Sequence, residues 1–114
     1  MSKTDHSFES HVYRVDKFVV PAAARREFLD RVRQTHEVLR RQTGFIRDLI
    51  LEQSAGPGEF NFVTLVEWES EAVLADVRAA VAAFHKEIAF DPQERLTRLG
   101  IKADIGIYVR ITES

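Results

Sequence analysis

Residues 45–68, which read FIRDLILEQSAGPGEFNFVTLVEW, contain two strand-like segments on either side of a turn. The segments 45–53 and 60–68 are rich in aliphatic and aromatic residues, and residues 54–59 between them include two glycines and a proline. Short apolar segments joined by such a turn are typical of neighbouring antiparallel strands. This stretch therefore predicts the antiparallel part of a sheet, and the rest of the chain is interpreted outward from it.

A strand and a helix are expected before this hairpin. Residues 11–20 are rich in β-branched and aromatic residues, which predicts a strand. The strand is expected to end before Pro21, because proline cannot sit inside a central strand. Residues 22–42 then predict a helix that stops at Gly44. Its apolar face at helical spacing contains Phe28, Leu29, Val32, His36 and Leu39.

Two helices and a last strand are expected after the hairpin. Ser70 can cap the first of these helices. Asp91 and Pro92 begin a short third helix that stops at Gly100, and residues 101–111 alternate as a strand. The apolar stripe of the second helix contains Val73, Val77, Val81, Phe84 and Ile88.

The resulting element order is β-α-β-β-α-α-β. It predicts an α+β fold of the ferredoxin-like, split βαβ type, with a four-stranded antiparallel sheet. Strands 11–20 and 60–68 are expected at its centre. The 114 residues suffice for one domain, expected over residues 11–111, with a flexible arm over 1–10 and a tail over 112–114. His6 and His11 are expected to belong to the N-terminal tail.

Both faces of this sheet are expected to be apolar. Period-two counting places Phe45, Leu49 and Leu51 with Phe62, Val66 and Trp68 on one face, and Ile46, Ile50, Val63, Leu65, Tyr13, Val15 and Val19 on the other. One layer of helices covers only one face, and an open apolar sheet face is unusual for a soluble monomer. The sequence therefore predicts a homodimer through the second face, with a monomer that exposes this face as the alternative.

Composition narrows the possible partners. A formal net charge of -2 without a basic stripe disfavours nucleic acid and anionic membranes. Because the chain has no cysteine, disulfides, thiolate catalysis and Cys-ligated metals are excluded. No segment is typical of a signal peptide or a membrane span, so a cytoplasmic location is expected.

The chain resembles the antibiotic biosynthesis monooxygenase family over about residues 11–111. The resemblance lies in Val20-Pro21, in Thr43-Gly44-Phe45, and in Val66-Glu67-Trp68-Glu69-Ser70 before the second helix. It implies a dimeric α/β barrel with one pocket per subunit, between the helices and the sheet. The family includes oxygenases that oxidise polyphenolic aromatics without metal or flavin, and it also includes haem-degrading enzymes.

The resemblance places Trp68 on the pocket side of the sheet. Counting in twos along the strand from Trp68 places Thr64 on the same side. If strands 11–20 and 45–53 pair with this strand in the assumed register, Arg14, Asp16 and Arg47 also lie on the pocket side. A carboxylate and a guanidinium on an apolar face must pair, reach water or serve a ligand. Asp16 is a candidate general base, with Arg14 or Arg47 holding an oxyanion and Thr64 donating a hydrogen bond; a structural ion pair is the alternative.

Trp68 and two histidines complete the candidate site. Trp68 would form a flat wall for an aromatic ligand, or it would only pack in the core. His36 lies within an apolar stripe, where it would take a proton or belong to the core. His85 flanks the stripe of the second helix, nearly where the resemblance places the axial histidine of haem-binding members.

The chain departs from family patterns at three positions. Polyphenol oxygenases of this type carry an asparagine where this chain has Thr64. Haem-degrading members carry an asparagine and a tryptophan where this chain has Asp16 and Val77.

The leading hypothesis is a monooxygenase that needs no cofactor and oxidises an electron-rich phenolic or quinol-like aromatic with dioxygen. Asp16 or His36 would remove a proton in a dry pocket, so that the resulting anion could reduce dioxygen directly. The first alternative is a haem-binding or haem-degrading protein that uses His85. The second is a non-enzymatic dimer that binds a small molecule.

Overall fold

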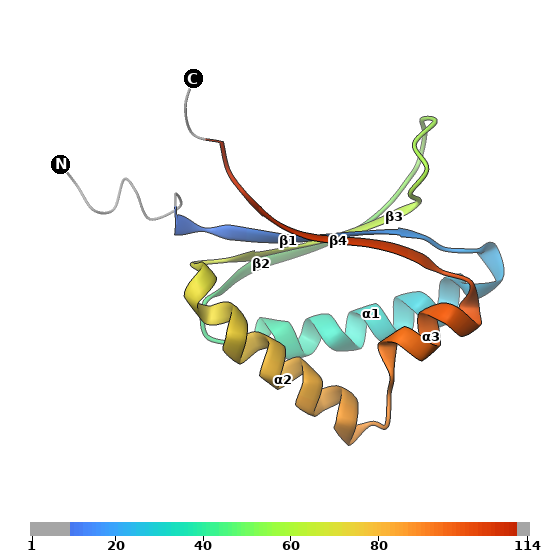
Figure 1. Cartoon of the computed structure of the whole chain (residues 1–114). Helices are drawn as coiled ribbons and strands as arrows, with labels where there is room; N and C mark the ends of the chain where they lie inside the picture. The colour runs from blue at the N-terminus through green and yellow to red at the C-terminus, as the bar shows by residue number, and fades with distance from the viewer. Residues whose placement is uncertain (1–9, 112–114) are drawn as a thin grey trace.

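The fold is a four-stranded antiparallel sheet with helices against one face, as seen in a computed structural model that describes residues 10–111 (Figure 1). Residues 1–9 of the expected arm and the tail 112–114 lie outside the described part. The strands are β1 (Val12–Val19), β2 (Phe45–Glu52), β3 (Phe62–Trp68) and β4 (Lys102–Val109). The helices are α1 (Arg25–Arg40), α2 (Leu74–Glu87) and α3 (Pro92–Leu99), and the 3-10 turns η2 (Ala22–Ala24) and η3 (Glu71–Val73) precede the first two.

The sheet has the strand order β2-β3-β1-β4. It places β1 and β3 at the centre, and every neighbouring pair is antiparallel. This arrangement confirms the predicted α+β, ferredoxin-like split βαβ fold. Within the described part of the chain, no helix is long and apolar enough to span a membrane.

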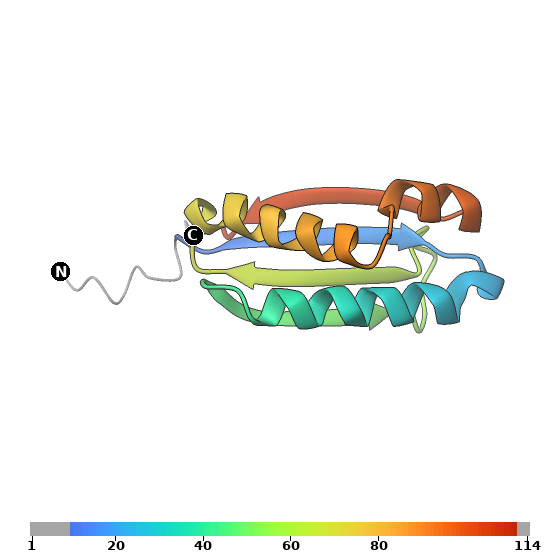
Figure 2. The same ribbon diagram turned by 90° about the horizontal axis from the view of Figure 1, so that it is seen from below.

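The three helices differ in their distance from the sheet. Seen from the helix side, α1 lies along the β2 edge of the sheet, α2 runs obliquely from the β4 side toward α1, and α3 lies beyond the end of α2 near the β4 edge (Figure 2). The C-terminal end of α2 is far from the sheet, and the connection to α3 returns toward it (Figure 1). The end of α2 therefore lies farther from the sheet than α1 and α3 do (Figure 1).

Local signals set most of the helix ends. Gly44 and Gly100 have φ angles of 91° and 70°, the left-handed conformation that glycine adopts without strain. The carboxylate of Asp91 accepts hydrogen bonds from the two backbone N–H groups that follow Pro92, as the sequence predicts. Ser70 is different, because its side chain makes no capping hydrogen bond. The predicted Ser70 cap is wrong.

Two apolar clusters occupy the two ends of the helix-facing side of the sheet. Along β1, Phe18 belongs to one cluster and Val12 to the other, and Arg14 and Asp16 lie between them. The first cluster contains Phe18, Val20, Ala24, Phe28, Leu29, Phe62 and Ile101, and the second contains Val12, Val66, Trp68, Leu74 and Val77. Polar side chains therefore occupy the middle of this face.

A bulge in β2 reverses the predicted facing of most of that strand. The register against β3 shifts between Phe45 and Arg47, after which Arg47 lies opposite Glu67, and Leu49 lies opposite Leu65. One extra residue moves every later side chain of a strand to the other face. Arg47 and Leu49 therefore face away from the helices, together with Leu51, and the predicted facing of these three residues is wrong. Asp48 and Ile50 take their places on the helix-facing side, so the predicted placement of Ile50 on the second face is also wrong.

The face away from the helices, here called the open face, is largely apolar. The alternation confirms the predicted placement of five residues there: Tyr13, Val15, Val19, Val63 and Leu65. Leu49 and Leu51 join them and remain 41% and 48% exposed, and Tyr108 of β4 is 46% exposed. A sheet face with this much exposed apolar surface is suited to a partner.

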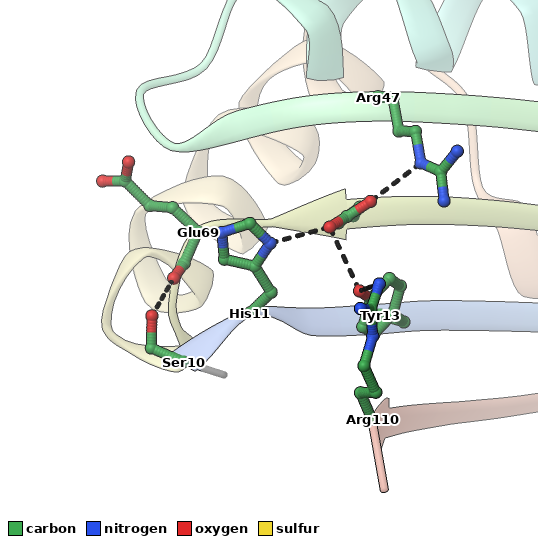
Figure 3. A network of polar contacts seen from close by, with 7 residues as sticks. Ser10, His11, Tyr13, Arg47, Glu69 and Arg110 are labelled. Carbon is green, nitrogen blue, oxygen red and sulfur yellow. Dashed lines mark hydrogen bonds and ion pairs between the residues drawn. The ribbon is translucent and has the colours of Figure 1, made fainter. Parts of the chain in front are cut away.

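A polar network occupies one end of the open face (Figure 3). Glu67 is buried and accepts hydrogen bonds from His11 Nδ1 (2.7 Å), Tyr13 Oη (3.1 Å) and Arg47 Nε (2.8 Å). Burial raises the pKa of Glu67, but the hydrogen bonds from His11, Arg47 and Tyr13 outweigh this and leave the pKa below its ordinary value. His11 is thus tied to the sheet, and its assignment to the tail is wrong.

Candidate active site

A cavity of about 580 Å³ lies between the sheet and the three helices. Ligand pockets usually measure roughly 300–1,000 Å³, so this volume suits an aromatic ring system. Its walls are mostly apolar and come from β1, β3, β4 and all three helices. The polar side chains between the two apolar clusters form its floor.

Asp16 is the acidic group on this floor. Its Oδ1 accepts a 2.6 Å hydrogen bond from Nε of Arg14, and its side chain is only 16% exposed. Burial raises the pKa of Asp16 above its ordinary value, although the hydrogen bond and charge of Arg14 and the charge of His36 act in the opposite direction. A carboxyl group whose pKa is raised toward neutrality is suited to accept a proton from a weak acid.

His36 lines the same cavity and is held from behind by Asp48. Its Nδ1–H donates to Oδ2 of Asp48 (2.8 Å), and Arg40 binds the same carboxylate through two hydrogen bonds of 3.0 and 2.9 Å. The hydrogen bond from Arg40, and further that from His36, lower the pKa of Asp48 despite its partial burial. The contact fixes the proton on Nδ1 and leaves Nε2 as the nitrogen available to the cavity.

Thr64 and Trp68 of β3 form further parts of the wall. Thr64 lies opposite Asp16 across the β1–β3 pairing, and Thr64 and Trp68 are 5% and 2% exposed. Trp68 also packs edge-on against Phe45, with the ring centroids 5.7 Å apart. It is both a core residue and a cavity wall.

His85 and Phe90 lie at the other end of the cavity, where α2 leads into α3. Their ring centroids are 4.9 Å apart, and Nε2 of His85 is buried without a hydrogen-bond partner in the described part of the chain. Burial lowers the pKa of His85, and the positive charge of Arg31 lowers it further. This histidine therefore favours its neutral form.

The cavity brings together six of the seven predicted site residues: Arg14, Asp16, His36, Thr64, Trp68 and His85. Arg47 is not among its lining residues because the β2 bulge directs it to Glu67 on the open face. Sequence reasoning missed three residues. Asp48 was hidden by the bulge, whereas Arg31 and Arg95 line the cavity from α1 and α3. A one-residue shift in the alternation of β2 would have indicated Asp48, but helical spacing alone gives no signal for the two arginines.

Residues 12–87 match the antibiotic biosynthesis monooxygenase family. No curated protein matches the chain.

Solved structures share the fold at low sequence identity. A conserved protein from Methanosarcina mazei Go1 is 21% identical, with a TM-score of 0.71 over 94% of this chain and 99% of its own. A variant of SnoaB, a cofactor-independent oxygenase from Streptomyces nogalater, is 20% identical, with a TM-score of 0.67 over 91% and 96%. A variant of MhuD with two manganese protoporphyrin IX molecules per active site is 19% identical, with a TM-score of 0.66 over 90% and 97%. At these identities the likeness establishes the fold alone.

Proposed function

Because this chain belongs to the antibiotic biosynthesis monooxygenase family, we propose that it is a cofactor-independent monooxygenase of an electron-rich phenolic or quinol-like aromatic. The observation that carries the proposal is the largely buried carboxyl of Asp16, which has a raised pKa and lies in a mostly apolar cavity of aromatic size. The likeness of the fold to SnoaB supports it.

Proton removal is the step that these side chains would perform. Asp16 accepts the phenolic proton, and the guanidinium of Arg14, already 2.6 Å from its carboxylate, stabilises the phenolate that forms. His36 is the second possible acceptor through Nε2, since Asp48 holds its other nitrogen. Thr64 would donate a hydrogen bond to the anion, and Trp68 would stack on the ring.

The substrate itself supplies the electrons that reduce dioxygen. In an anthrone-like substrate, the hydroxyl proton that Asp16 accepts belongs to the enol tautomer and is one of the two hydrogens of the reacting carbon in the keto form, and both C–H bonds of that carbon are replaced by a carbonyl bond. One oxygen atom of dioxygen enters that carbonyl, and the other leaves as water with the two hydrogens. The protein contributes the base, the charge that favours the anion, and a cavity that limits the access of water.

The proposal includes a homodimer through the open face. Exposed Leu49, Leu51 and Tyr108 support it, because packing two such faces about a two-fold axis removes apolar surface from water in both copies. The cavity lies on the opposite side of the sheet, so each subunit keeps its own site.

The test is conversion of an anthrone-like compound by metal-free protein in air and under argon, with oxygen consumption followed in the aerobic sample. We expect turnover in air that Asp16→Asn abolishes or strongly reduces. Asp76→Asn is the matched control, since Asp76 is exposed on α2 and does not line the cavity. Turnover that depends on neither oxygen nor Asp16 would contradict the proposal. Tight binding without turnover would indicate the non-enzymatic dimer.

Haem binding is the second candidate, and His85 is the specific observation that favours it. The buried Nε2 of His85 lines the cavity without a partner in the described residues, and the neutral imidazole is the form that binds iron. A bound haem would supply iron-based oxygen chemistry, with His85 as its ligand. The test is a haemin titration, in which a Soret shift that is lost in His85→Ala would support this candidate. A titration without a Soret shift would rule it out.

A further inference from the structure

Two buried side-chain nitrogens lack hydrogen-bond partners in the described part of the chain, and both belong to cavity-lining residues. They are Nε2 of His85 and Nε of Arg95. Both side chains flank the ring of Phe90, with the ring centroid of His85 at 4.9 Å and Cζ of Arg95 at 5.1 Å from its centroid. Unsatisfied buried polar groups are costly, so their concentration at one end of a cavity indicates a place for a polar group of a ligand.

Arg31 adds positive charge at the same place. Its Cζ lies 4.6 Å from the Phe90 centroid, and its Nη1 donates to the side-chain oxygen of Gln34 (2.8 Å). No carboxylate within residues 10–111 forms an ion pair with Arg31. The guanidinium therefore retains donors for a ligand.

The acidic groups at this end do not balance its arginines. Glu27 is the carboxylate that lines the cavity here, and it pairs with both Arg95 and Arg98. Arg31 also lines the cavity and lies against Phe90, so the lining around this ring carries more positive than negative charge. At the floor of the cavity, in contrast, Arg14 is paired with Asp16. One end of the cavity is thus cationic and the floor is close to neutral.

We infer that the aromatic substrate carries a carboxylate, which Arg31 and Arg95 bind beside the His85–Phe90 pair. The planar guanidinium matches the geometry of a carboxylate, and Phe90 limits the access of water to the contact. Such a substrate would lie with its acid group near α3 and its hydroxyl group near Asp16. This inference deepens the proposed function and rests on it for the fate of the ring, but the carboxylate preference can be measured as binding alone.

The experiment compares two matched ligands by titration calorimetry. One is a hydroxynaphthoate with its hydroxyl and carboxylate at opposite ends of the ring system, and the other is the neutral hydroxynaphthamide of the same pattern. We expect the intact protein to bind the carboxylate about tenfold more tightly or better, because a charged bidentate contact is stronger than a neutral one.

The variants assign this preference to named side chains. Arg31→Gln should reduce it to within about twofold while the affinity for the amide stays nearly unchanged. Arg31→Lys should restore only part of it, because lysine keeps the charge and loses the planar fork. Arg33→Gln is the control, since Arg33 is an exposed arginine of the same helix that does not line the cavity. Arg95→Gln provides a second test, with circular dichroism to confirm that the loss of its Glu27 contact leaves the fold intact.

The outcomes separate this inference from the proposed function. Equal affinity for both ligands would overturn the carboxylate preference and leave an aromatic site in place. Failure of both ligands to bind would overturn the inference and the aromatic site together. If only haemin binds, with a Soret shift that depends on His85, the carboxylates would be those of haem and the inferred substrate class would be wrong.

Discussion

Replacing Leu51 with aspartate tests whether the open face of the sheet joins two copies of this protein. Leu51 faces away from the helices and lies opposite Val63 of β3, so its side chain is far from the cavity side. The substitution places a carboxylate in the proposed contact and leaves the residues of the cavity unchanged.

The expected magnitude follows from the exposure of this side chain. Complete burial of a leucine contributes about 1.5–3 kcal/mol. Because Leu51 is 48% exposed in the single subunit, covering the rest would contribute about 0.7–1.4 kcal/mol per copy. Two-fold symmetry doubles this loss to about 1.4–2.9 kcal/mol per dimer, which is about a tenfold to hundredfold weaker association. Burying the new carboxylate adds to the loss.

Sedimentation velocity over a range of concentrations measures the effect. The intact chain should sediment as a particle of twice the 13.1 kDa subunit mass, and Leu51→Asp should shift the population toward the subunit mass. Ala79→Asp, at an exposed position of α2, is the control with the same change in charge. The reasoning fails if the intact chain remains at 13.1 kDa, or if Leu51→Asp associates as tightly as the control.

Three further predictions concern the cavity and the fold. Burial raises the pKa of Asp16, so the oxidation rate should rise with pH as this group loses its proton above its ordinary pKa of 3.8. Asp16→Asn should remove that pH dependence and lower the rate by about a hundredfold or more, as measured by oxygen consumption. The pKa of Asp48 is lowered mainly by its hydrogen bond from Arg40, so its contribution to stability exists above the ordinary pKa and disappears as pH falls through the folded value. Asp48→Asn should therefore cost about 1 kcal/mol in urea unfolding at neutral pH and almost nothing in strong acid, and an equal cost at both would contradict this explanation. Gly44→Ala should cost about 1–3 kcal/mol in thermal unfolding, because φ is 91° and the new Cβ would lie 2.8 Å from a side-chain carbon of η3. Gly56→Ala is its control, with φ of 101° and no atom within 4 Å, and an equal cost for both variants would show that the close contact contributes nothing.

The fold was predictable because its signals are local. The capping carboxylate of Asp91, the left-handed glycines at positions 44 and 100, and the alternation of β1 and β3 each depend on neighbours in the sequence. The floor of the cavity followed from this alternation, since Arg14 and Asp16 share a face with Thr64 and Trp68 once the central strands are paired.

The rest of the site depends on tertiary structure. Both faces of β2 are apolar, so period-two counting gave no sign of the bulge that directs Asp48 toward His36. Arg31 and Arg95 come from separate helices and meet around Phe90 only in the folded chain, where Glu27 of α1 pairs with Arg95 of α3. His11 looked like part of a tail because its partner, Glu67, is distant in the sequence.

The extra residue in β2 also affects how related sequences should be aligned. A relative that lacks one residue within 45–47 would pair regularly with β3 and would still direct Asp48 toward the imidazole of His36. A chain that kept this residue but paired without the bulge would instead place Arg47 behind the imidazole and withdraw Leu49 and Leu51 from the opposite surface. An alignment of this strand should therefore place its gap at the bulge, because the pairing there sets both the ionic partner of the histidine and the surface available for self-association.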